Sequence, residues 1–129
     1  MNISEVGKRA GLPPKTIRFY EDIGLISPRR EANGYRAFSD ADLHRLAFLR
    51  RARALGFSVE ECRQLLALYH DDTRASSDVK AIAREHLERI DRQLEELAQM
   101  RATLVDLIEA CAGDHRPDCP ILRDLAQRA

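Results

Sequence analysis

The sequence contains no tryptophan, and it has only three tyrosines and four phenylalanines among its 129 residues. One third of the residues are charged. A composition poor in aromatics and rich in charge favours long exposed helices over a thick core, so we predict a mostly α-helical fold. Because a chain of this length buries a modest fraction of its surface, we expect a partner chain to supply part of its stability.

The sequence also lacks an apolar run of about 18 residues and a charged-then-apolar signal segment, so we expect no membrane partner and a cytoplasmic location. In that reducing compartment, three cysteines favour metal or redox chemistry over a structural disulfide. No serine, histidine and carboxylate set falls in a recognisable catalytic motif. An enzyme is therefore the least favoured class.

Net charge is absent as well, but the two halves of the chain differ. Residues 1–57 hold 11 basic and 6 acidic residues, and residues 58–129 hold 10 basic and 15 acidic residues. The formal charges are therefore +5 and −5. A basic front half on a neutral chain indicates a polyanionic partner, such as double-stranded DNA, for that half alone.

Two short helices are predicted at the start of the chain, over residues 3–10 and 14–23. A corner that contains Gly11 joins them, and this arrangement is typical of a helix-turn-helix, whose second helix enters the major groove of DNA. We expect Ile17 and Phe19 to face inward, and Lys15 and Arg18 to share the outer face. The alternative, which the pattern leaves open, is an ordinary amphipathic helix with solvated cations.

A hairpin is predicted next, because Asn33-Gly34 is a strong turn signal and residues 35–38 suit a returning strand. Beside a helix-turn-helix such a hairpin is a wing, although it can also be a solvated loop. The following helices are expected to begin at Asp40 and Val59, after capping boxes, and the first of them ends in a basic run. The predicted DNA-binding residues are Lys15, Thr16, Arg18, Tyr20, Arg30, Tyr35, Arg36 and Arg53.

A long helix is predicted over residues 78–110, after a polar segment at 71–77. Its apolar residues follow alternating steps of four and three, which favours a coiled coil between two chains over packing on the front half of the same chain. The domains are then residues 1–70 for DNA binding, 71–110 for linker and dimerisation, and 111–129 for a metal-binding loop with a short helix. The predicted dimerisation residues are Leu87, Ile90, Leu94, Leu97 and Leu104.

Cys111 and Cys119 face each other across seven residues that cannot continue the long helix, because Gly113 and Pro117 interrupt it. Two thiolates suit a soft monovalent ion such as Cu(I), whereas Zn(II) normally takes four donors. The sequence does not separate Cu(I) from Ag(I) or Au(I), and His115 is a candidate nitrogen donor. A redox switch that closes a disulfide is the alternative. Cys62 lies on an apolar stripe and is expected to be inert core.

Several segments together carry a family resemblance: Met-Asn-Ile-Ser-Glu-Val at the start, Thr-Ile-Arg-Phe-Tyr-Glu-Asp-Ile-Gly-Leu-Ile at 16–26, Asn-Gly-Tyr-Arg at 33–36, and Leu-Ala-Phe-Leu-Arg-Arg-Ala-Arg-Ala-Leu-Gly-Phe at 46–57. With the spaced cysteines and the Pro-Ile that follows them, the chain resembles the MerR family of metal-responsive transcription activators over essentially its full length. Within that family it looks like the copper-responsive CueR or HmrR type.

The resemblance implies a homodimer whose long helices pair antiparallel. It also implies promoter binding between elements set too far apart, and DNA distortion on metal binding that lets RNA polymerase engage and switches on copper efflux or detoxification genes. In divalent-sensing members a third cysteine stands where this chain has Ser76, so the resemblance favours a monovalent ion at Cys111 and Cys119. The iron–sulfur branch needs four cysteines, and this loop has two.

Overall fold

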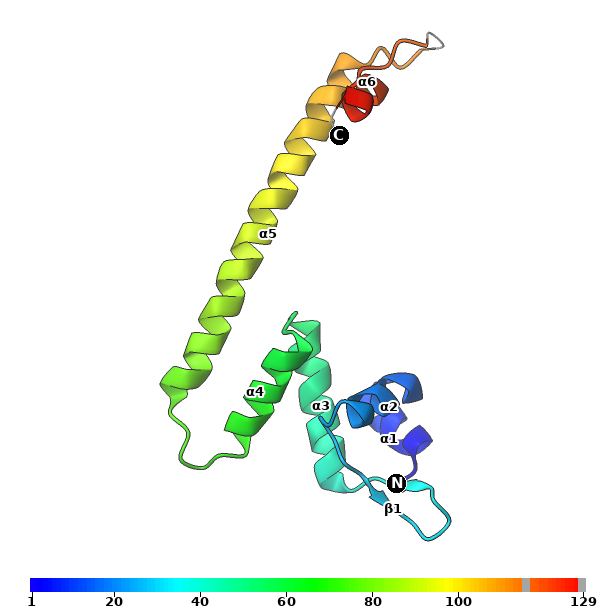
Figure 1. The fold of residues 1–129 in the computed structure, drawn as a ribbon, viewed down its shortest axis with the longest axis vertical. Helices are drawn as coiled ribbons and strands as arrows, with labels where there is room; N and C mark the ends of the chain where they lie inside the picture. Colours follow the sequence, from blue (N-terminus) through cyan, green and yellow to red (C-terminus); the bar gives the residue numbers. More distant parts are fainter. Residues whose placement is uncertain (115–116, 128–129) are drawn as a thin grey trace. The chain divides into compact units, whose positions relative to one another are not determined.

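The computed structural model describes residues 1–114 and 117–127 (Figure 1). It contains helices and one small hairpin, as the sequence predicts. The chain divides into two compact units, the N-terminal unit Met1–Ile82 and the C-terminal unit Ala83–Ala129. The elements, in chain order, are α1 (Ile3–Ala10), α2 (Pro14–Asp22), β1 (Arg29–Arg30), β2 (Arg36–Ala37), α3 (Asp40–Ala54), α4 (Val59–Tyr69), α5 (Ser76–Ala110) and α6 (Pro120–Gln127).

The predicted starts of α1, α3 and α4 are confirmed, because local caps fix them. The Asn2 side chain accepts the Glu5 N–H at 2.8 Å at the start of α1. Ser39 and Ser58 each form a complete capping box, so α3 and α4 begin where the sequence predicts. The long helix begins at Ser76, two residues earlier than expected.

The corner between α1 and α2 depends on two glycines. Gly11 ends α1 with φ +73°, a left-handed conformation that glycine adopts without strain, and its N–H donates to Gly7 O. A side chain at Gly7 would place its Cβ 2.7 Å from the Leu12 carbonyl oxygen. Only glycine at residue 7 therefore lets the corner fold back closely enough for α2 to pack on α1.

One hydrophobic core lies within the N-terminal unit, where α1 packs against α2 and α3, and α3 packs against α4. The segment after α2 joins this core through Leu25 and Ile26. Its buried residues are Val6, Ala10, Ile17, Tyr20, Leu25, Ile26, Phe38, Leu46, Leu49, Ala52, Cys62 and Leu66.

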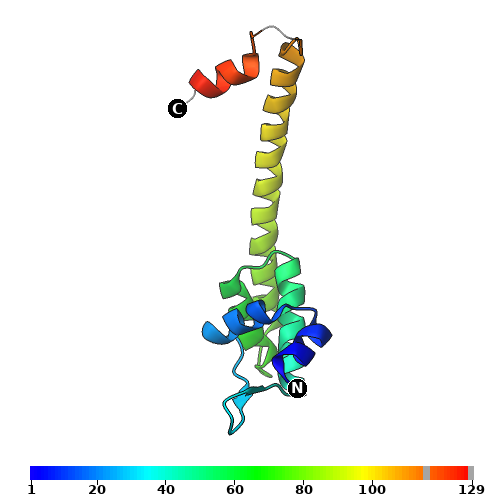
Figure 2. The same cartoon turned by 90° about the vertical axis from the view of Figure 1, so that its right-hand side faces the viewer.

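The wing is a two-stranded antiparallel hairpin in which Arg29 pairs with Ala37 and Arg30 with Arg36. It projects beyond the helices of the N-terminal unit in Figure 2. Phe38 ties its base to the start of the chain, because the Phe38 N–H donates to Met1 O at 2.8 Å and the Met1 ammonium donates to Phe38 O at 2.9 Å. The N-terminal unit thus carries α2 and the wing on a shared core.

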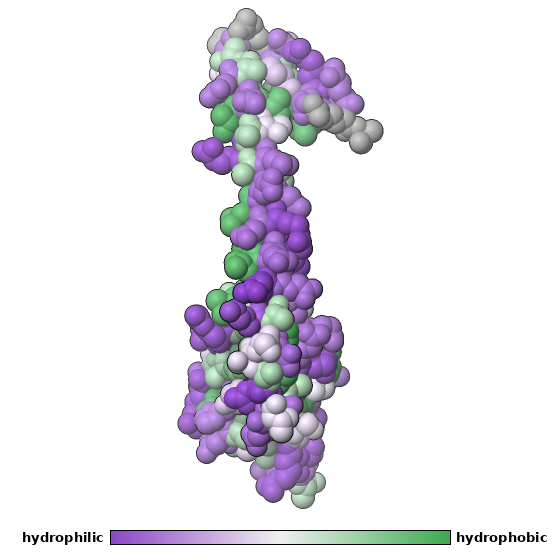
Figure 3. Space-filling model, turned by 90° about the vertical axis from the view of Figure 1, so that its left-hand side faces the viewer, coloured by the Kyte–Doolittle hydropathy of each residue, from purple (hydrophilic) through white to green (hydrophobic). Residues whose placement is uncertain are grey.

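The C-terminal unit contains most of α5, the cysteine loop and α6. Large apolar side chains along α5 are more than half exposed, including Leu94 and Leu97, and Figure 3 shows apolar side chains along one edge of this helix. None of the helices in the described part of the chain combines the length and the apolar character that a membrane span requires.

Candidate nucleic-acid interface and metal site

Helix α2 presents the predicted DNA-reading residues on its first turns. Pro14 is its first residue, where the fixed φ of proline suits a helix start. Lys15 and Arg18 are exposed and lie three residues apart on one face, and Thr16 is half-buried. Ile17 is fully buried, as predicted.

Tyr20 corrects the sequence analysis. Its side chain is 4% exposed and belongs to the core of the N-terminal unit, so the prediction that it contacts DNA is wrong. Tyr20 lies three residues after Ile17 and therefore shares the inward face of the helix. Phe19, which was expected to face inward, is 48% exposed instead.

The wing residues Arg30, Tyr35 and Arg36 lie on the hairpin, as predicted. Tyr35 is 73% exposed, the most exposed aromatic side chain in the described residues. Asn33-Gly34 lies within a five-residue loop, residues 31–35, between the paired residues Arg30 and Arg36. Gly34 has φ +85°, and its N–H donates to Glu31 O at 2.9 Å.

Two of the three wing arginines, Arg30 and Arg36, bind Glu21 of α2. Arg36 Nε lies 2.8 Å and Arg30 Nη2 3.2 Å from the same carboxylate oxygen, Glu21 Oε1. Arg30 Nη1 also donates to Gly34 O at 3.1 Å. The sequence analysis did not identify Glu21, because an acidic residue in a basic unit gives no signal until the hairpin folds back to it.

Arg18 of α2 and Tyr35 and Arg36 of the wing line one concave surface, with a volume of about 640 Å³. The start of the chain, including Asn2, forms another part of its wall. Residues far apart in sequence thus meet on one face with two guanidinium groups. Guanidinium groups are common donors to phosphate, and the carboxylates of Glu5 and Glu31 line the same surface.

Arg53 lies apart from that concave surface. Its Nη1 donates to Phe57 O at 2.7 Å, which stabilises the turn after α3. This contact gives Arg53 a structural role next to the predicted role in DNA binding.

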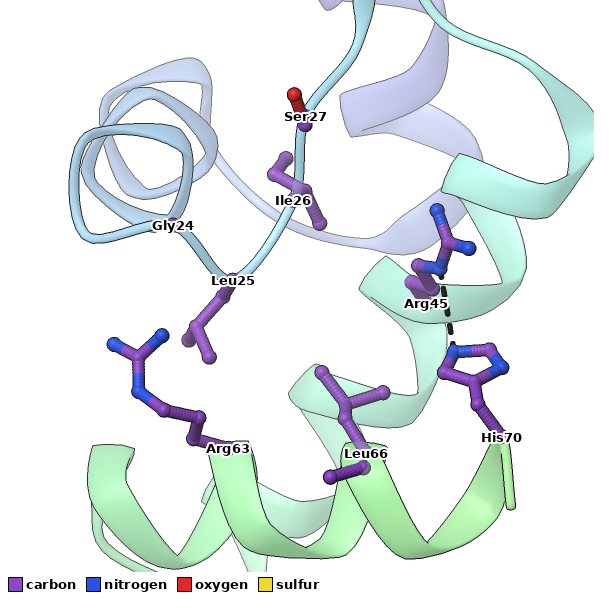
Figure 4. Close-up of a pocket in the computed structure, with 9 residues that line it drawn as sticks. Gly24, Leu25, Ile26, Ser27, Arg45, Arg63, Leu66 and His70 are labelled. Carbon is purple, nitrogen blue, oxygen red and sulfur yellow. Dashed lines mark hydrogen bonds between the residues drawn. The ribbon is translucent and has the colours of Figure 1, made fainter.

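A second cavity of about 270 Å³ lies between the segment after α2 and helices α3 and α4 (Figure 4). Its cationic side chains form hydrogen bonds that stabilise the fold. Arg63 Nη2 donates to Ile23 O at 2.7 Å, and Arg45 Nε donates to His70 Nε2 at 3.3 Å. These bonds connect α4 to the end of α2 and to α3.

The two loop cysteines are brought together in the C-terminal unit. Cys111 follows the last residue of α5, and Cys119 immediately precedes Pro120, the first residue of α6. Both thiols are free and partly buried, and the Cys111 side chain hydrogen-bonds to that of Cys119. The structure thus places both thiols in one loop, and their role as metal ligands stays a prediction.

The pKa of the Cys119 thiol is lowered, mainly because the Leu122 backbone N–H donates to its sulfur. The Ile121 N–H and the Cys111 side chain lower it further, while partial burial and the Asp118 carboxylate act in the opposite direction. Cys119 therefore occupies the cap position of α6, where free N–H groups stabilise a negative charge. Asp118, which precedes α6, forms an ion pair with Arg123 of that helix.

Within residues 1–114 and 117–127, no group of three or more His, Cys, Asp or Glu side chains is placed to hold a metal ion. His115, the candidate nitrogen donor, lies outside the described residues. Ser76 is the exposed first residue of α5 and belongs to the N-terminal unit. The described donors of the loop are therefore two thiols.

Cys62, the third cysteine, is fully buried in the core, as predicted. Burial raises the pKa of its thiol, and the nearby Arg53 lowers it to a lesser extent. A buried neutral thiol of this kind acts as a small apolar side chain.

The predicted dimerisation residues lie along α5 with little covering from their own unit. Leu87, Leu94, Leu97 and Leu104 are 53–59% exposed, and Ile90 is half-buried. Such a narrow apolar stripe on a helix suits one helical partner.

Known proteins with the same features confirm the family. Residues 1–68 match the family described as "MerR HTH family regulatory protein", and residues 43–107 match the one described as "MerR, DNA binding". The HTH-type transcriptional regulator HmrR of Rhizobium leguminosarum bv. viciae is 60% identical over the whole of both chains. The HTH-type transcriptional regulator CueR of Yersinia pestis is 46% identical, over 98% of this chain and 91% of its own.

Among solved structures, the transcription regulator PbrR691 of Ralstonia metallidurans CH34, in complex with lead(II), is 34% identical and superposes with a TM-score of 0.85. The match covers 97% of this chain and 98% of that one. With helix-turn-helix, wing, long helix and cysteine loop all in place, the chain belongs to the MerR family of helix-turn-helix transcription regulators.

Proposed function

We propose that this regulator is a Cu(I)-responsive transcription activator that binds promoter DNA as a homodimer. The observation that carries the proposal is the placement of two free thiols in one loop, Cys111 directly after α5 and Cys119 directly before α6, where the Leu122 N–H lowers the pKa of Cys119. Metal ions bind thiolates rather than thiols, so a site that lowers a thiol pKa is prepared for a metal.

The donor set fits a soft monovalent ion. Two thiolates complete the coordination of Cu(I), whereas Zn(II) normally takes four donors. Two thiolates with one monovalent cation leave one negative charge, and the N–H groups at the start of α6 offset it. Ser76, in place of the third cysteine expected of divalent-sensing relatives, supports the same choice. Lead(II) in PbrR691 supports metal binding in general but not copper.

DNA binding is assigned to the N-terminal unit. Lys15, Thr16 and Arg18 of α2 would contact the major groove, and the wing residues Arg30, Tyr35 and Arg36 would contact phosphates or the minor groove. Arg53 stays a weaker proposal, because its guanidinium already binds Phe57 O. The basic charge of the front half supports this assignment.

Dimerisation is assigned to the exposed stripe of α5, with a second copy of this chain as the partner. We further propose that metal binding favours a dimer that distorts the promoter, so that RNA polymerase engages and copper efflux or detoxification genes are switched on. DNA distortion costs on the order of 1 to 6 kcal/mol, a range that differential metal binding can supply.

The decisive variant is Cys119→Ser. We expect it to abolish Cu(I)-induced transcription while leaving DNA binding intact, because serine oxygen is a poor ligand for a soft ion. Cys62→Ala is the matched control, since it removes a thiol outside the loop, and it should respond to Cu(I) normally. The measurement is promoter transcription during titration with Cu(I), Ag(I), Au(I) and Zn(II). A full Cu(I) response in Cys119→Ser would place the site elsewhere.

The thiol contact also favours a second function, a redox switch that closes a Cys111–Cys119 disulfide. The two are separated by excess reductant, which leaves Cu(I) binding intact but prevents a disulfide. A metal-free transcriptional response to a dithiol-specific oxidant supports the switch. Failure of the reduced dimer to bind Cu(I) rules out the copper function. A stronger response to Ag(I) or Au(I) than to Cu(I) would reassign the ion and keep the site.

A further inference from the structure

Glu21 is an acidic side chain between α2 and the wing, the two elements proposed to bind DNA. It is the last residue but one of α2, and its side chain is 16% exposed. A carboxylate near phosphates weakens DNA binding by repulsion, so its place here calls for a compensating role. Its contacts point to one, because a single oxygen accepts both Arg36 Nε and Arg30 Nη2.

The wing needs such a contact. Each of its strands has two residues, and a two-stranded hairpin is marginally stable by itself. Its base is attached to the chain start through Phe38 and Met1, and these bonds hold the base rather than the tip. Glu21 holds one arginine from each strand, and Arg30 in turn binds Gly34 O in the loop. A single carboxylate thus connects α2 with both strands and the tip.

We infer that Glu21 is a positioning residue for DNA binding, which sets the wing relative to α2 and aims Arg30 and Arg36. The inference rests on the proposed DNA-binding function. Glu21 touches no DNA in this proposal. It acts by placing Arg30 and Arg36, so that Arg36 and Arg18 border the same concave surface.

The direction in which one substitution changes DNA affinity separates a positioning role from a simple effect of charge. Glu21→Gln removes a negative charge, so if repulsion of phosphates were its only effect, DNA affinity would rise. If Glu21 positions the wing, affinity falls although the protein has become more basic. Asp22→Asn is the matched control, because it makes the same charge change at the next residue of α2, where the side chain is exposed.

The experiment uses the full-length protein and the duplex that the wild type selects from a random-sequence DNA library. We expect Glu21→Gln to weaken binding about fivefold at matched salt, and Asp22→Asn to bind as well as the wild type or better. The slope of log affinity against log salt is negative, and for Glu21→Gln it should become less steep by about one, since a displaced wing loses a phosphate contact. A smaller folded fraction alone would leave that slope unchanged.

Glu21→Asp is the second variant, because it keeps the charge and the helix but shortens the side chain by one methylene group. Glu21→Asp should also bind DNA more weakly than the wild type. If thermal unfolding shows that Glu21→Gln does not fold, the DNA affinity of Glu21→Asp tests the inference instead. Wild-type affinity in both folded variants, or tighter binding by Glu21→Gln, would overturn the inference. If the wild type and Asp22→Asn select no duplex, the proposed DNA-binding function fails instead.

Discussion

The two units use their apolar residues in opposite ways. In the N-terminal unit, Leu46 and Leu49 of α3 are fully buried by neighbouring elements of the same chain. In the C-terminal unit, Leu94 and Leu97 of α5 are 59% and 57% exposed, and α6 has no buried residue in its described part. The first unit is complete with one chain, whereas the second has an apolar stripe that only another surface can cover.

The difference follows from the spacing of apolar residues. In the N-terminal unit, short helices meet at tight corners, and each contributes two or three side chains to one core. In the 35-residue helix α5, apolar residues recur in steps of four and three from Ala83 to Ile108, with Arg101 at the one step that breaks the pattern, which produces a narrow line and no enclosed volume. A line of this kind is buried by a second helix, so we assign structural stability to the first unit and assembly to the second.

Leu46→Ala should have the largest effect on stability. It removes a fully buried side chain and leaves a cavity, which destabilises the N-terminal unit by about 3 kcal/mol. Leu97→Ala is the matched substitution on α5. Its effect should depend on protein concentration, because it weakens dimers rather than the fold of one chain. Thermal unfolding at two protein concentrations measures both. A concentration-independent loss for Leu97→Ala would contradict the assignment of α5 to assembly.

Arg18→Ala should have an intermediate effect, on DNA affinity. Arg18 is exposed on α2 and borders the concave surface beside the wing, so its loss should weaken binding about tenfold, with or without metal. Lys80→Ala on α5 removes one positive charge elsewhere and should change affinity much less. Gel-shift titrations at matched salt test this. Equal affinity for Arg18→Ala and the wild type would remove Arg18 from the interface.

Much of the fold could be predicted because its signals are local. Asn2, Ser39 and Ser58 cap helices through bonds to residues three positions later, and the structure confirms each start. The wing was predictable in its turn but less so in its strands: the Gly34 N–H donates to Glu31 O and the Glu31 N–H donates to Tyr35 O, whereas the returning strand comprises Arg36–Ala37 rather than residues 35–38. Strand pairing depends on contacts across the hairpin as well as on the turn residues.

The site could be predicted in part. Cys111 and Cys119 were identifiable because a helix end and a helix start bring them together. The orientation of Tyr20 could not be predicted, because a tyrosine suits a DNA-binding surface and a hydrophobic core equally well when only the sequence is known. Glu21 was invisible because its role comes from two arginines that only the folded hairpin brings to it. Tertiary contacts decided both residues.

The smallest expected effect concerns the reactivity of the thiols. Like the leucines, the cysteines of the two units differ in how deeply they are buried. The pKa of Cys119 is lowered by N–H donation from Leu122, whereas burial raises the pKa of Cys62. Alkylation requires the thiolate, so as pH rises Cys119 should react earlier in the native protein than in urea, where α6 and its N–H groups are lost. Cys62 should react only after unfolding. Iodoacetamide labelling of metal-free protein across pH, read by mass spectrometry, measures both.

Superimposable native and urea profiles for Cys119 would mean that the start of α6 does not stabilise its thiolate, and the case for a prepared metal site would then rest on the thiol contact alone.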